Sequence, residues 1–245
     1  MRRRTALVTG SGQNIGRAIA LGLAADGFDI VVNGLSKREQ CEETAEVARA
    51  QGVDALVVMA DAGTSEGCTA LAGAAIERFG AVHVLVHNAA IRPQCPFLEM
   101  DEGALNRVFD VNFMAAFRLS QLCLPGMIEA KWGRIVTFAG MNAISGYNGR
   151  AHVSVSKHAA WGFAKALAKE FAPSGITVNC ISPGPISTGR DDPGMTAHIT
   201  AMEARVPLGR LGEPGEVAAA VSLLASEKGA FINGQLIQVN GGAQT

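Results

Sequence analysis

Neither charge predominates in this 245-residue chain: 21 Lys and Arg stand against 22 Asp and Glu, and the formal net charge is -1. Nucleic-acid-binding domains usually carry a clear positive excess, so that class of protein is excluded. No apolar run approaches the ~18 residues of a membrane-spanning helix, so no membrane segment is expected. Because 48% of the residues are hydrophobic, the chain can bury a large core and is not a disordered protein.

Paired cysteines are also missing. The five cysteines stand at positions 41, 68, 95, 123 and 180, and no two have the spacing of a redox or zinc motif. Isolated thiols are typical of a reducing compartment, so we expect a cytoplasmic location. His83 and His87 could share one face of a strand, but no third ligand is spaced to complete a metal site. We therefore predict no bound metal.

Short apolar runs alternate with longer helical patterns along the whole chain. The apolar runs are nearly continuous, as in strands covered on both faces; they lie at 6–8, 30–32, 55–59, 82–86, 134–138, 176–178 and 236–239. Helical patterns lie at 15–26, 38–51, 65–79, 102–130, 153–171 and 214–226. This alternation predicts an α/β fold, a Rossmann-like doubly wound sheet of about seven parallel strands, in a single domain over 1–245. The segment at about 184–210 is predicted to form a substrate flap. Arg2 to Arg4 are basic like the start of a signal peptide, but the apolar run that follows is too short, and a first strand is expected there.

A glycine-rich segment follows the first strand, from Thr9 to Gly16. Glycine allows a sharp turn and a close approach of the backbone to a phosphate. The next helix then offers free N–H groups to the anion. The position of the loop between a strand and a helix predicts a dinucleotide site.

With this loop and several later motifs, the chain resembles the short-chain dehydrogenase/reductases. It shares Thr9, Gly10 and Gly16 with their glycine motif, while Asn14 stands where the family has a glycine. Asn tolerates a left-handed backbone, so we expect the loop to survive. The later matches are Asp61, the segment His87-Asn88-Ala89-Ala90, Asn112, the turn Pro183-Gly184-Pro185-Ile186-Ser187-Thr188 and the C-terminal Asn240-Gly241-Gly242. The resemblance implies a dinucleotide held by Gly10, Gly12, Asn14, Ile15, Gly16, Asp61, Asn88, Ala89, Lys157, Pro183, Gly184, Ile186 and Thr188, with Asp61 at the adenine.

The end of the second strand bears on the choice between NADP and NAD. An NAD site usually has an acid there, whereas this chain has Ser36, Lys37 and Arg38 shortly after the strand. These residues would suit a 2′-phosphate and favour NADP. Two observations keep NAD possible. The two cations could be a solvated helix turn, and Gln13 stands where many NADP-using relatives have Arg.

The resemblance implies a catalytic set of Ser, Tyr and Lys with a helper Asn, and this chain departs from it. Lys157 and Asn112 match, but Val153 stands at the Tyr position, four residues before Lys157, and Gly140 stands at the Ser position. The Tyr would have supplied or taken the substrate proton on the same helix face as the Lys.

Three residues are candidates to replace the missing proton donor. Tyr147 is the single tyrosine and lies in the loop before Lys157, but it could equally pack on the flap. Ser154 shares a helix face with Lys157, although capping the helix would be its ordinary role. His152 has a suitable unperturbed pKa but is placed just before the helix, so its direction is open.

We therefore predict an NAD(P)-dependent oxidoreductase with a non-standard proton relay, acting on a small carbonyl or alcohol substrate. Two alternatives stay open: a non-redox enzyme (a lyase, dehydratase or isomerase) on the same scaffold, and a catalytically silent dinucleotide-binding protein. A homo-oligomer, a tetramer, is also expected. Helices 102–130 and 153–171 carry apolar residues on more than one face, among them Phe113, Phe117, Trp161 and Phe163.

Overall fold

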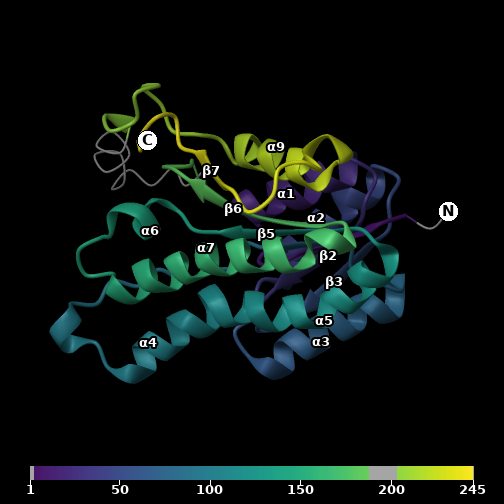
Figure 1. The fold of residues 1–245 in the computed structure, drawn as a ribbon, viewed down its shortest axis with the longest axis horizontal. Helices are drawn as coiled ribbons and strands as arrows, with labels where there is room; N and C mark the ends of the chain where they lie inside the picture. The colour runs from purple at the N-terminus through teal and green to yellow at the C-terminus, as the bar shows by residue number, and fades with distance from the viewer. Residues whose placement is uncertain (1–2, 188–202, 245) are drawn as a thin grey trace.

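The computed structural model describes residues 3–187 and 203–244, and it contains the predicted sheet (Figure 1). Seven parallel strands lie in the order β3-β2-β1-β4-β5-β6-β7. Their bounds are β1 Thr5–Val8, β2 Asp29–Gly34, β3 Ala55–Met59, β4 Val84–His87, β5 Gly133–Phe138, β6 Ile176–Pro183 and β7 Leu236–Val239. The predicted Rossmann-like α/β fold is confirmed.

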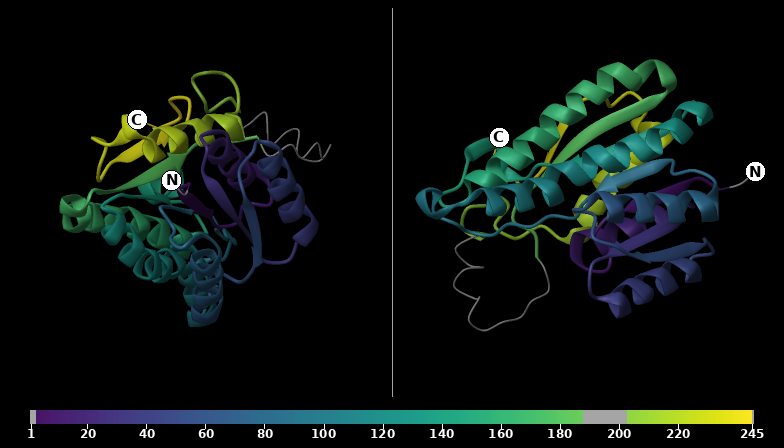
Figure 2. Two further views of the ribbon diagram at one scale, coloured as in Figure 1. Left: turned by 90° about the vertical axis from the view of Figure 1, so that its right-hand side faces the viewer. Right: turned by 90° about the horizontal axis from the view of Figure 1, so that it is seen from below.

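Helices cover both faces of this sheet (Figures 1 and 2). One face carries α1 (Asn14–Ala25), α2 (Arg38–Ala50) and α9 (Pro214–Ala225). The other carries α3 (Ser65–Phe79), α5 (Ala115–Ala130) and α7 (Ala151–Phe171). The shorter α4 (Glu102–Phe109) and α6 (Met141–Ser145) lie near the carboxyl ends of the strands, and single 3-10 turns lie at Phe97–Glu99, Ala172–Ser174 and Glu227–Gly229.

The two helical layers create two cores, and alternate residues of each central strand serve one core or the other. Ala6 and Val8 of β1 pack toward α1 and α9, whereas Leu7 packs toward α3 and α5. All three are fully buried. Side chains alternate between the two faces of a strand, so a strand covered on both faces must be apolar throughout.

Two helix predictions need correction. The pattern at 102–130 is not one helix, because a π-helical turn at Asp110–Met114 separates α4 from α5. The helix predicted to start at 153 begins at Ala151, with Arg150 as its N-cap. π-Turns often lie at functional sites, and this one contains Asn112. Residues 188–202 of the predicted flap, including Thr188, lie outside the described residues, so the flap stays a prediction.

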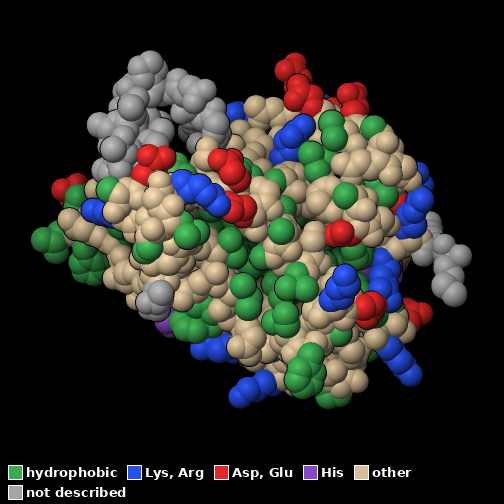
Figure 3. All heavy atoms as spheres, turned by 90° about the horizontal axis from the view of Figure 1, so that it is seen from above, with side chains coloured by type: hydrophobic (Ala, Val, Ile, Leu, Met, Phe, Trp, Pro, Cys, Tyr) green, Lys and Arg blue, Asp and Glu red, His purple; other side chains and the backbone are tan. Residues whose placement is uncertain are grey.

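The surface fits the near-neutral composition. On the face seen in Figure 3, acidic and basic side chains are interspersed and do not form a patch of one charge. Within residues 3–187 and 203–244, no helix combines the length and apolar character that crossing a membrane requires.

Candidate functional site

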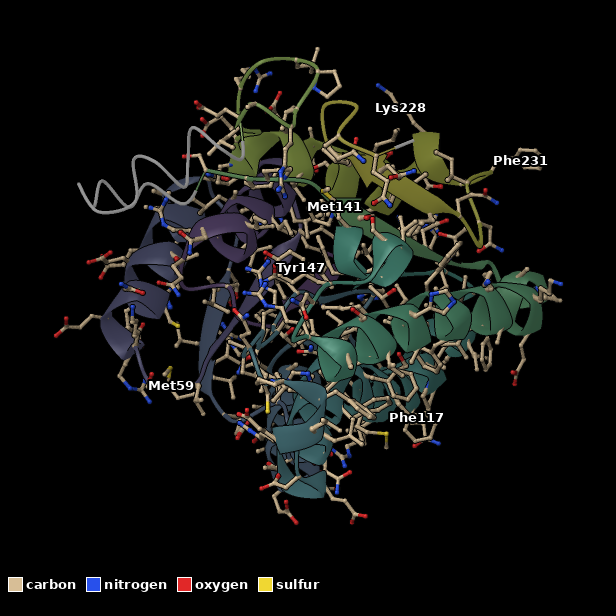
Figure 4. All side chains as sticks on the ribbon, turned by 90° about the vertical axis from the view of Figure 1, so that its left-hand side faces the viewer. Met59, Phe117, Met141, Tyr147, Lys228 and Phe231 are labelled. Atoms are coloured by element: carbon tan, nitrogen blue, oxygen red, sulfur yellow. The ribbon has the colours of Figure 1, made fainter. Side chains whose placement is uncertain are left out.

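The predicted site residues gather at the carboxyl ends of the parallel strands. Figure 4 looks onto this edge of the sheet, and Met141 and Tyr147, from the segment between β5 and α7, lie near its middle. The strand order reverses direction between β1 and β4. In an open α/β sheet, the crevice at such a reversal is the usual ligand position.

The glycine loop has the conformation that an anion site needs. Gly10 has φ +62° and Asn14 has φ +51°, so the expected left-handed backbone at Asn14 is confirmed. A Cβ on Gly16 would overlap the carbonyl oxygen of Gly10 and lie 2.6 Å from Nδ2 of Asn88. The N-cap residue of α1, Gln13, makes no side-chain cap, and the first turn carries no acid. The first N–H groups of α1 are therefore available to a phosphate.

Asn88 and Ala89 fasten this loop to the end of β4. Nδ2 of Asn88 donates to the carbonyl oxygens of Thr9 (3.0 Å) and Gly10 (3.1 Å). In return, Oγ1 of Thr9 accepts the N–H groups of Asn88 (3.0 Å) and Ala89 (2.9 Å). Asn88 thus positions the glycine loop from the end of β4.

The loop also rests on its other neighbours. A Cβ on Gly12 would lie 2.8 Å from Sγ of Cys41, and Ile15 packs against the core below α1. Asn33, which sequence reasoning did not single out, is 2% exposed and joins three elements. Its Oδ1 accepts from Gly10 N at 3.3 Å, and its Nδ2 donates to two carbonyl oxygens at the end of β3, each at 3.1 Å. A buried polar residue at the end of β2 was the available sequence signal.

The residues predicted to read a 2′-phosphate lie beside the glycine loop. Ser36 and Lys37 are exposed in the turn before α2. Nζ of Lys37 lies 3.4 Å from Oε1 of Gln13. Arg38 instead donates to Glu42 at 3.3 Å, one helical turn ahead. Of the two cations, Lys37 is therefore the one oriented toward the loop.

Asp61, the predicted adenine contact, already has protein partners for both carboxylate oxygens. Oδ2 accepts from Arg107 at 2.9 Å, and Oδ1 accepts from the N–H of Gly63 at 2.8 Å. An adenine contact would have to share one of these oxygens. This ion pair could not be predicted from the sequence, because its partners are 46 residues apart.

The turn after β6 is fixed from two sides. The N–H of Gly184 donates to the Val239 carbonyl at 2.9 Å, and a Cβ on Gly184 would lie 2.6 Å from Cα of Asn240. Ile186 forms a bridge with Gly212. Pro183 to Ile186 are thus held at the carboxyl edge, where the resemblance predicts the nicotinamide.

Lys157 is buried at this same edge, with 5% of its surface exposed. Its Nζ donates to the carbonyl oxygen of Phe138, the last residue of β5, at 2.9 Å. Burial lowers the pKa of Lys157 to about 8, and the positive charge of Arg92 acts in the same direction. Lys157 can therefore release a proton near neutral pH.

The positions of the two missing catalytic residues differ in their surroundings. Val153 lies one turn before Lys157, is fully buried and has no group that could move a proton. Gly140 has φ +88°, and a Cβ there would meet no heavy atom within 4 Å among the described residues. The space at Gly140 is open, but a serine would need a backbone conformation that favours glycine.

Asn112 lies in the π-helical turn and is fully buried. Its side chain hydrogen-bonds to the backbone of Ile91, and its Nδ2 lies 3.2 Å from Oγ of Ser156 in α7. It therefore joins the loop after β4 to the helix that carries Lys157.

Tyr147 lies in the loop between α6 and α7 and is 51% exposed. The guanidinium carbon of Arg150 lies 4.8 Å from the centre of its ring. Its position at the strand ends (Figure 4) leaves it within the region of the predicted site. The cation over the ring limits how the phenol can turn.

The other two candidate proton donors lie in the first turn of α7, which corrects their predicted placement. His152 is not before the helix but inside it, 1% exposed, and burial lowers its pKa below the ordinary value. Ser154 does not cap the helix, because Arg150 is the N-cap residue and no side chain caps the helix. Oγ of Ser154 and both ring nitrogens of His152 have no partner among the described residues.

Two further histidines, His83 and His87, hydrogen-bond to the backbone. Nε2 of His87 lies 3.2 Å from the carbonyl oxygen of Val111, and Nδ1 of His83 accepts from the N–H of Thr5 at 3.1 Å. Burial lowers the pKa of His87 to about 3, so its ring is neutral at pH 7. Over the described ranges, no three His, Cys, Asp or Glu side chains are grouped as metal ligands.

Comparison with known proteins agrees with this geometry. The sequence profile of the enoyl-(acyl carrier protein) reductase family matches residues 10–244. A 3-oxoacyl-[acyl-carrier-protein] reductase of Staphylococcus aureus is 34% identical over 239 residues, which cover 98% of this chain and 97% of that protein. An acetoacetyl-CoA reductase of an Acinetobacter species is 37% identical over 245 residues, with 98% and 97% covered.

Solved structures give the same result. The acetoin dehydrogenase of Salmonella typhimurium is 32% identical and superposes with a TM-score of 0.90, covering 98% of this chain and 97% of that one. A putative short-chain alcohol dehydrogenase of Sinorhizobium meliloti is 28% identical with a TM-score of 0.92, and the match covers 99% and 97%. The chain thus belongs to the short-chain dehydrogenase/reductase family of oxidoreductases.

Proposed function

We propose that this protein transfers a hydride between a nicotinamide dinucleotide and a small carbonyl or alcohol compound, with Lys157 in place of the missing tyrosine as the proton donor. The observation that carries the proposal is Lys157 itself, buried and with a pKa of about 8 at the end of β5. Buried amines with a pKa lowered toward neutrality are enriched at catalytic sites, which favours an enzyme over a silent binding protein.

The residues of the chain fit a dinucleotide. Gly10 and Gly16 have no side chain that would keep a pyrophosphate away from the backbone. The start of α1 has no side-chain cap, so its N–H groups can also bind the pyrophosphate. Ile186 and Lys157 lie at the same edge of the sheet, where the nicotinamide half would lie. When bound, the dinucleotide supplies or accepts the hydride.

NADP is the dinucleotide we favour, with NAD as the alternative. Lys37 lies within 3.4 Å of Gln13, above the loop, and no acid stands at the end of β2. Ser36 is exposed beside it. A hydroxyl and an ammonium would satisfy a 2′-phosphate, whereas an acid would repel it.

Lys157 performs the proton step in this proposal. In the direction of reduction, the carbonyl oxygen gains a proton from the Lys157 ammonium, and the neutral amine then takes a proton from solvent. Oγ of Ser154, one turn earlier and without a partner, can carry this proton between Nζ and the substrate. Tyr147 is the second candidate, because it is the single phenol and lies at the same edge (Figure 4).

The test measures turnover as the decrease in the absorbance of the reduced nicotinamide. The substrates tried are a panel of small ketones, diketones and oxo acids. Lys157→Met keeps the volume and should lower turnover by about 10²-fold or more. Ser154→Ala and Tyr147→Phe then identify the relay. Lys169→Ala, an exposed lysine in the last turn of α7, is the control. Calorimetry that detects no binding of either dinucleotide to the native protein would refute the proposal and leave a non-redox enzyme as the better account.

A homo-oligomer, with a tetramer as the expected form, is part of the same proposal. The outer faces of α5 and α7 expose Leu122 (37%), Ile128 (42%) and Val155 (56%). Phe231 is fully exposed and points away from the body of the protein in Figure 4. A second copy is the partner that symmetric assembly would place on such faces. The cytoplasmic location stays a prediction that rests on the five unpaired thiols.

A further inference from the structure

The first turn of α7 gathers polar atoms that no described residue satisfies. They are Nε of Arg150, both ring nitrogens of His152 and Oγ of Ser154. These atoms come from only five consecutive residues, and His152 is 1% exposed, so solvent hardly reaches its ring. Native proteins seldom leave buried polar groups unpaired, and the unpaired atoms of Arg150 and Ser154, which are one helical turn apart, point to a polar ligand.

Three of the polar residues of this helix lie on one side of it. Arg150, Ser154 and Lys157 are separated by four and three residues, which is the spacing of neighbours along one helical face. The N–H of Ser154 donates to the carbonyl of Arg150 at 2.9 Å, so the helical register already holds there. Arg150 and Lys157 are thus two turns apart on the face that the proposed reaction uses.

A second cation, Arg92, lies in the loop after β4, and this loop is joined to the start of α7. Asn112 holds Ile91 in this loop, and the N–H of Cys95 donates to the carbonyl of Gly149 at 2.8 Å, which joins the loop to the start of α7. Arg92 lies between these two anchor points and is exposed. Its charge lowers the pKa of Lys157, so the two groups are close enough to interact.

These cations have no acidic partner in the described parts of the chain. No ion pair joins Arg92 or Arg150 to a carboxylate there. Arg150 is instead held over the ring of Tyr147. An arginine fixed in this way keeps its N–H groups free, and the planar fork matches a carboxylate or a phosphate.

We infer that the substrate is an anionic carbonyl compound, whose carboxylate or phosphate group binds Arg92 and Arg150 while its carbonyl group lies at Lys157. This inference rests on the proposed function and narrows its substrate class. Oγ of Ser154, on the same helix face, can add a neutral hydrogen bond to the same group. A neutral ketone would form no ion pair with either guanidinium group, so it would bind less tightly than its anionic counterpart.

The experiment uses matched pairs of compounds, in which one member carries an anionic group and the other does not. Acetoacetate is compared with its methyl ester, and dihydroxyacetone phosphate with dihydroxyacetone. Binding to the protein saturated with oxidised NADP is measured by calorimetry, and KM is measured for any pair that is reduced by NADPH. At least one anionic member should bind about tenfold or more tightly than its neutral twin. The pair that shows this difference in affinity identifies whether the site binds a carboxylate or a phosphate group.

Variants assign the effect to the two arginines. Arg92→Ala is a change at an exposed position, and Arg150→Met keeps the side-chain length. Each variant should lose about a tenfold or greater preference for the anionic compound over the neutral one. Lys169→Ala removes one positive charge from the far end of α7 and should leave the preference unchanged. Thermal unfolding checks that each variant is folded.

The two proposals fail in different ways. If neutral and anionic members bind equally well, or if neither anionic compound binds, the inferred anion site is wrong, whatever the turnover. If an anionic member binds through Arg92 and Arg150 but no compound is reduced, the anion site stands and the oxidoreductase proposal fails. A preference that survives in Arg92→Ala and Arg150→Met together would also overturn the inference.

Discussion

The side chain of Asn112 and the backbone of Ile91 form a closed pair of hydrogen bonds: Oδ1 accepts from the Ile91 N–H at 2.9 Å, and Nδ2 donates to the Ile91 carbonyl at 3.0 Å. This pair satisfies both polar groups of a backbone segment that belongs to no strand. It also fixes the loop that carries Arg92. Asn112 is therefore a positioning residue between the π-helical turn and the substrate side of the site.

Asn112→Ala should destabilise the protein by about 1–3 kcal/mol, because two backbone groups of Ile91 lose their partners. It should also raise KM more than it lowers kcat, since Arg92 loses its anchor. Denaturant unfolding and steady-state kinetics measure the two effects. Asn106→Ala, on the exposed side of α4, should change stability by no more than about 0.5 kcal/mol. Equal effects of the two substitutions would contradict the positioning role.

The pKa of Lys157, about 8, predicts the pH dependence of reduction. The proton-donating form is the ammonium, so kcat for reduction should be constant below pH 8 and fall tenfold per pH unit above it. Oxidation of the alcohol should show the opposite slope, because it needs the neutral amine. Lys157→Arg keeps the charge but cannot release a proton near neutral pH. A wild-type profile with no inflection between about pH 7 and 9 would exclude Lys157 as the acid.

Cofactor preference should depend on Lys37 and not on Arg38. Lys37 lies beside Gln13, whereas Arg38 is paired with Glu42. Lys37→Ala should weaken NADP binding by about tenfold and leave NAD binding unchanged, because only NADP carries the extra phosphate. Arg38→Ala is the matched control. Calorimetric titration with both dinucleotides tests this, and an equal loss for NADP and NAD would show that Lys37 is only a surface charge.

A single methyl group at Gly16 should disrupt the glycine loop. Its Cβ would overlap the Gly10 carbonyl oxygen and crowd Nδ2 of Asn88. Gly16→Ala should therefore abolish dinucleotide binding by deforming the loop, before any contact with the pyrophosphate. Gly73→Ala, in α3 with no described heavy atom within 4 Å of the new Cβ, should bind dinucleotide normally. Unchanged affinity in Gly16→Ala would defeat the assignment of the loop.

His87 should make the folded state sensitive to acid. Burial lowers its pKa to about 3 from the ordinary value of 6.5, so below pH 6.5 the unfolded chain binds a proton that the folded chain excludes. This contribution is neutral above pH 6.5 and costs about 2 kcal/mol at pH 5. His87→Asn should lose less stability between pH 7 and pH 5 than the wild type. Denaturant midpoints at the two pH values measure the difference, and equal losses would contradict the depressed pKa.

Much of the fold could be predicted because its signals are local in the sequence. Nearly continuous apolar runs indicated all seven strands. An Asn at a glycine position of the family motif indicated a left-handed backbone at Asn14, which its φ of +51° confirms. The π-helical turn at Asp110–Met114 could not be predicted, since its residues fit an ordinary helix. The turn depends on tertiary contacts of Asn112 with Ile91 and Ser156.

The candidate site was harder to predict for the same reason. Arg92 and Arg150 are 58 positions apart in sequence, and tertiary contacts such as the hydrogen bond between Cys95 and Gly149 show that their loops meet. His152 was misplaced because the start of α7 has no capping signature: its N-cap residue is Arg150, not the usual Ser, Thr, Asp or Asn. The residue types indicated the chemistry of the site. Only the contacts in the folded protein showed which site residues already have hydrogen-bond partners within the chain.

The strand order has a consequence for how such a protein can change over generations. The proposed dinucleotide-selecting turn follows β2, on one side of the sheet centre, whereas the loops with Arg92 and Arg150 follow β4 and β5, on the other side. The glycine loop after β1, with its Asn88 anchor, lies between them. Mutations that exchange one coenzyme for another therefore need not disturb the recognition of the metabolite, and new metabolites can be accepted without changing the coenzyme. The two specificities can evolve, or be engineered, independently.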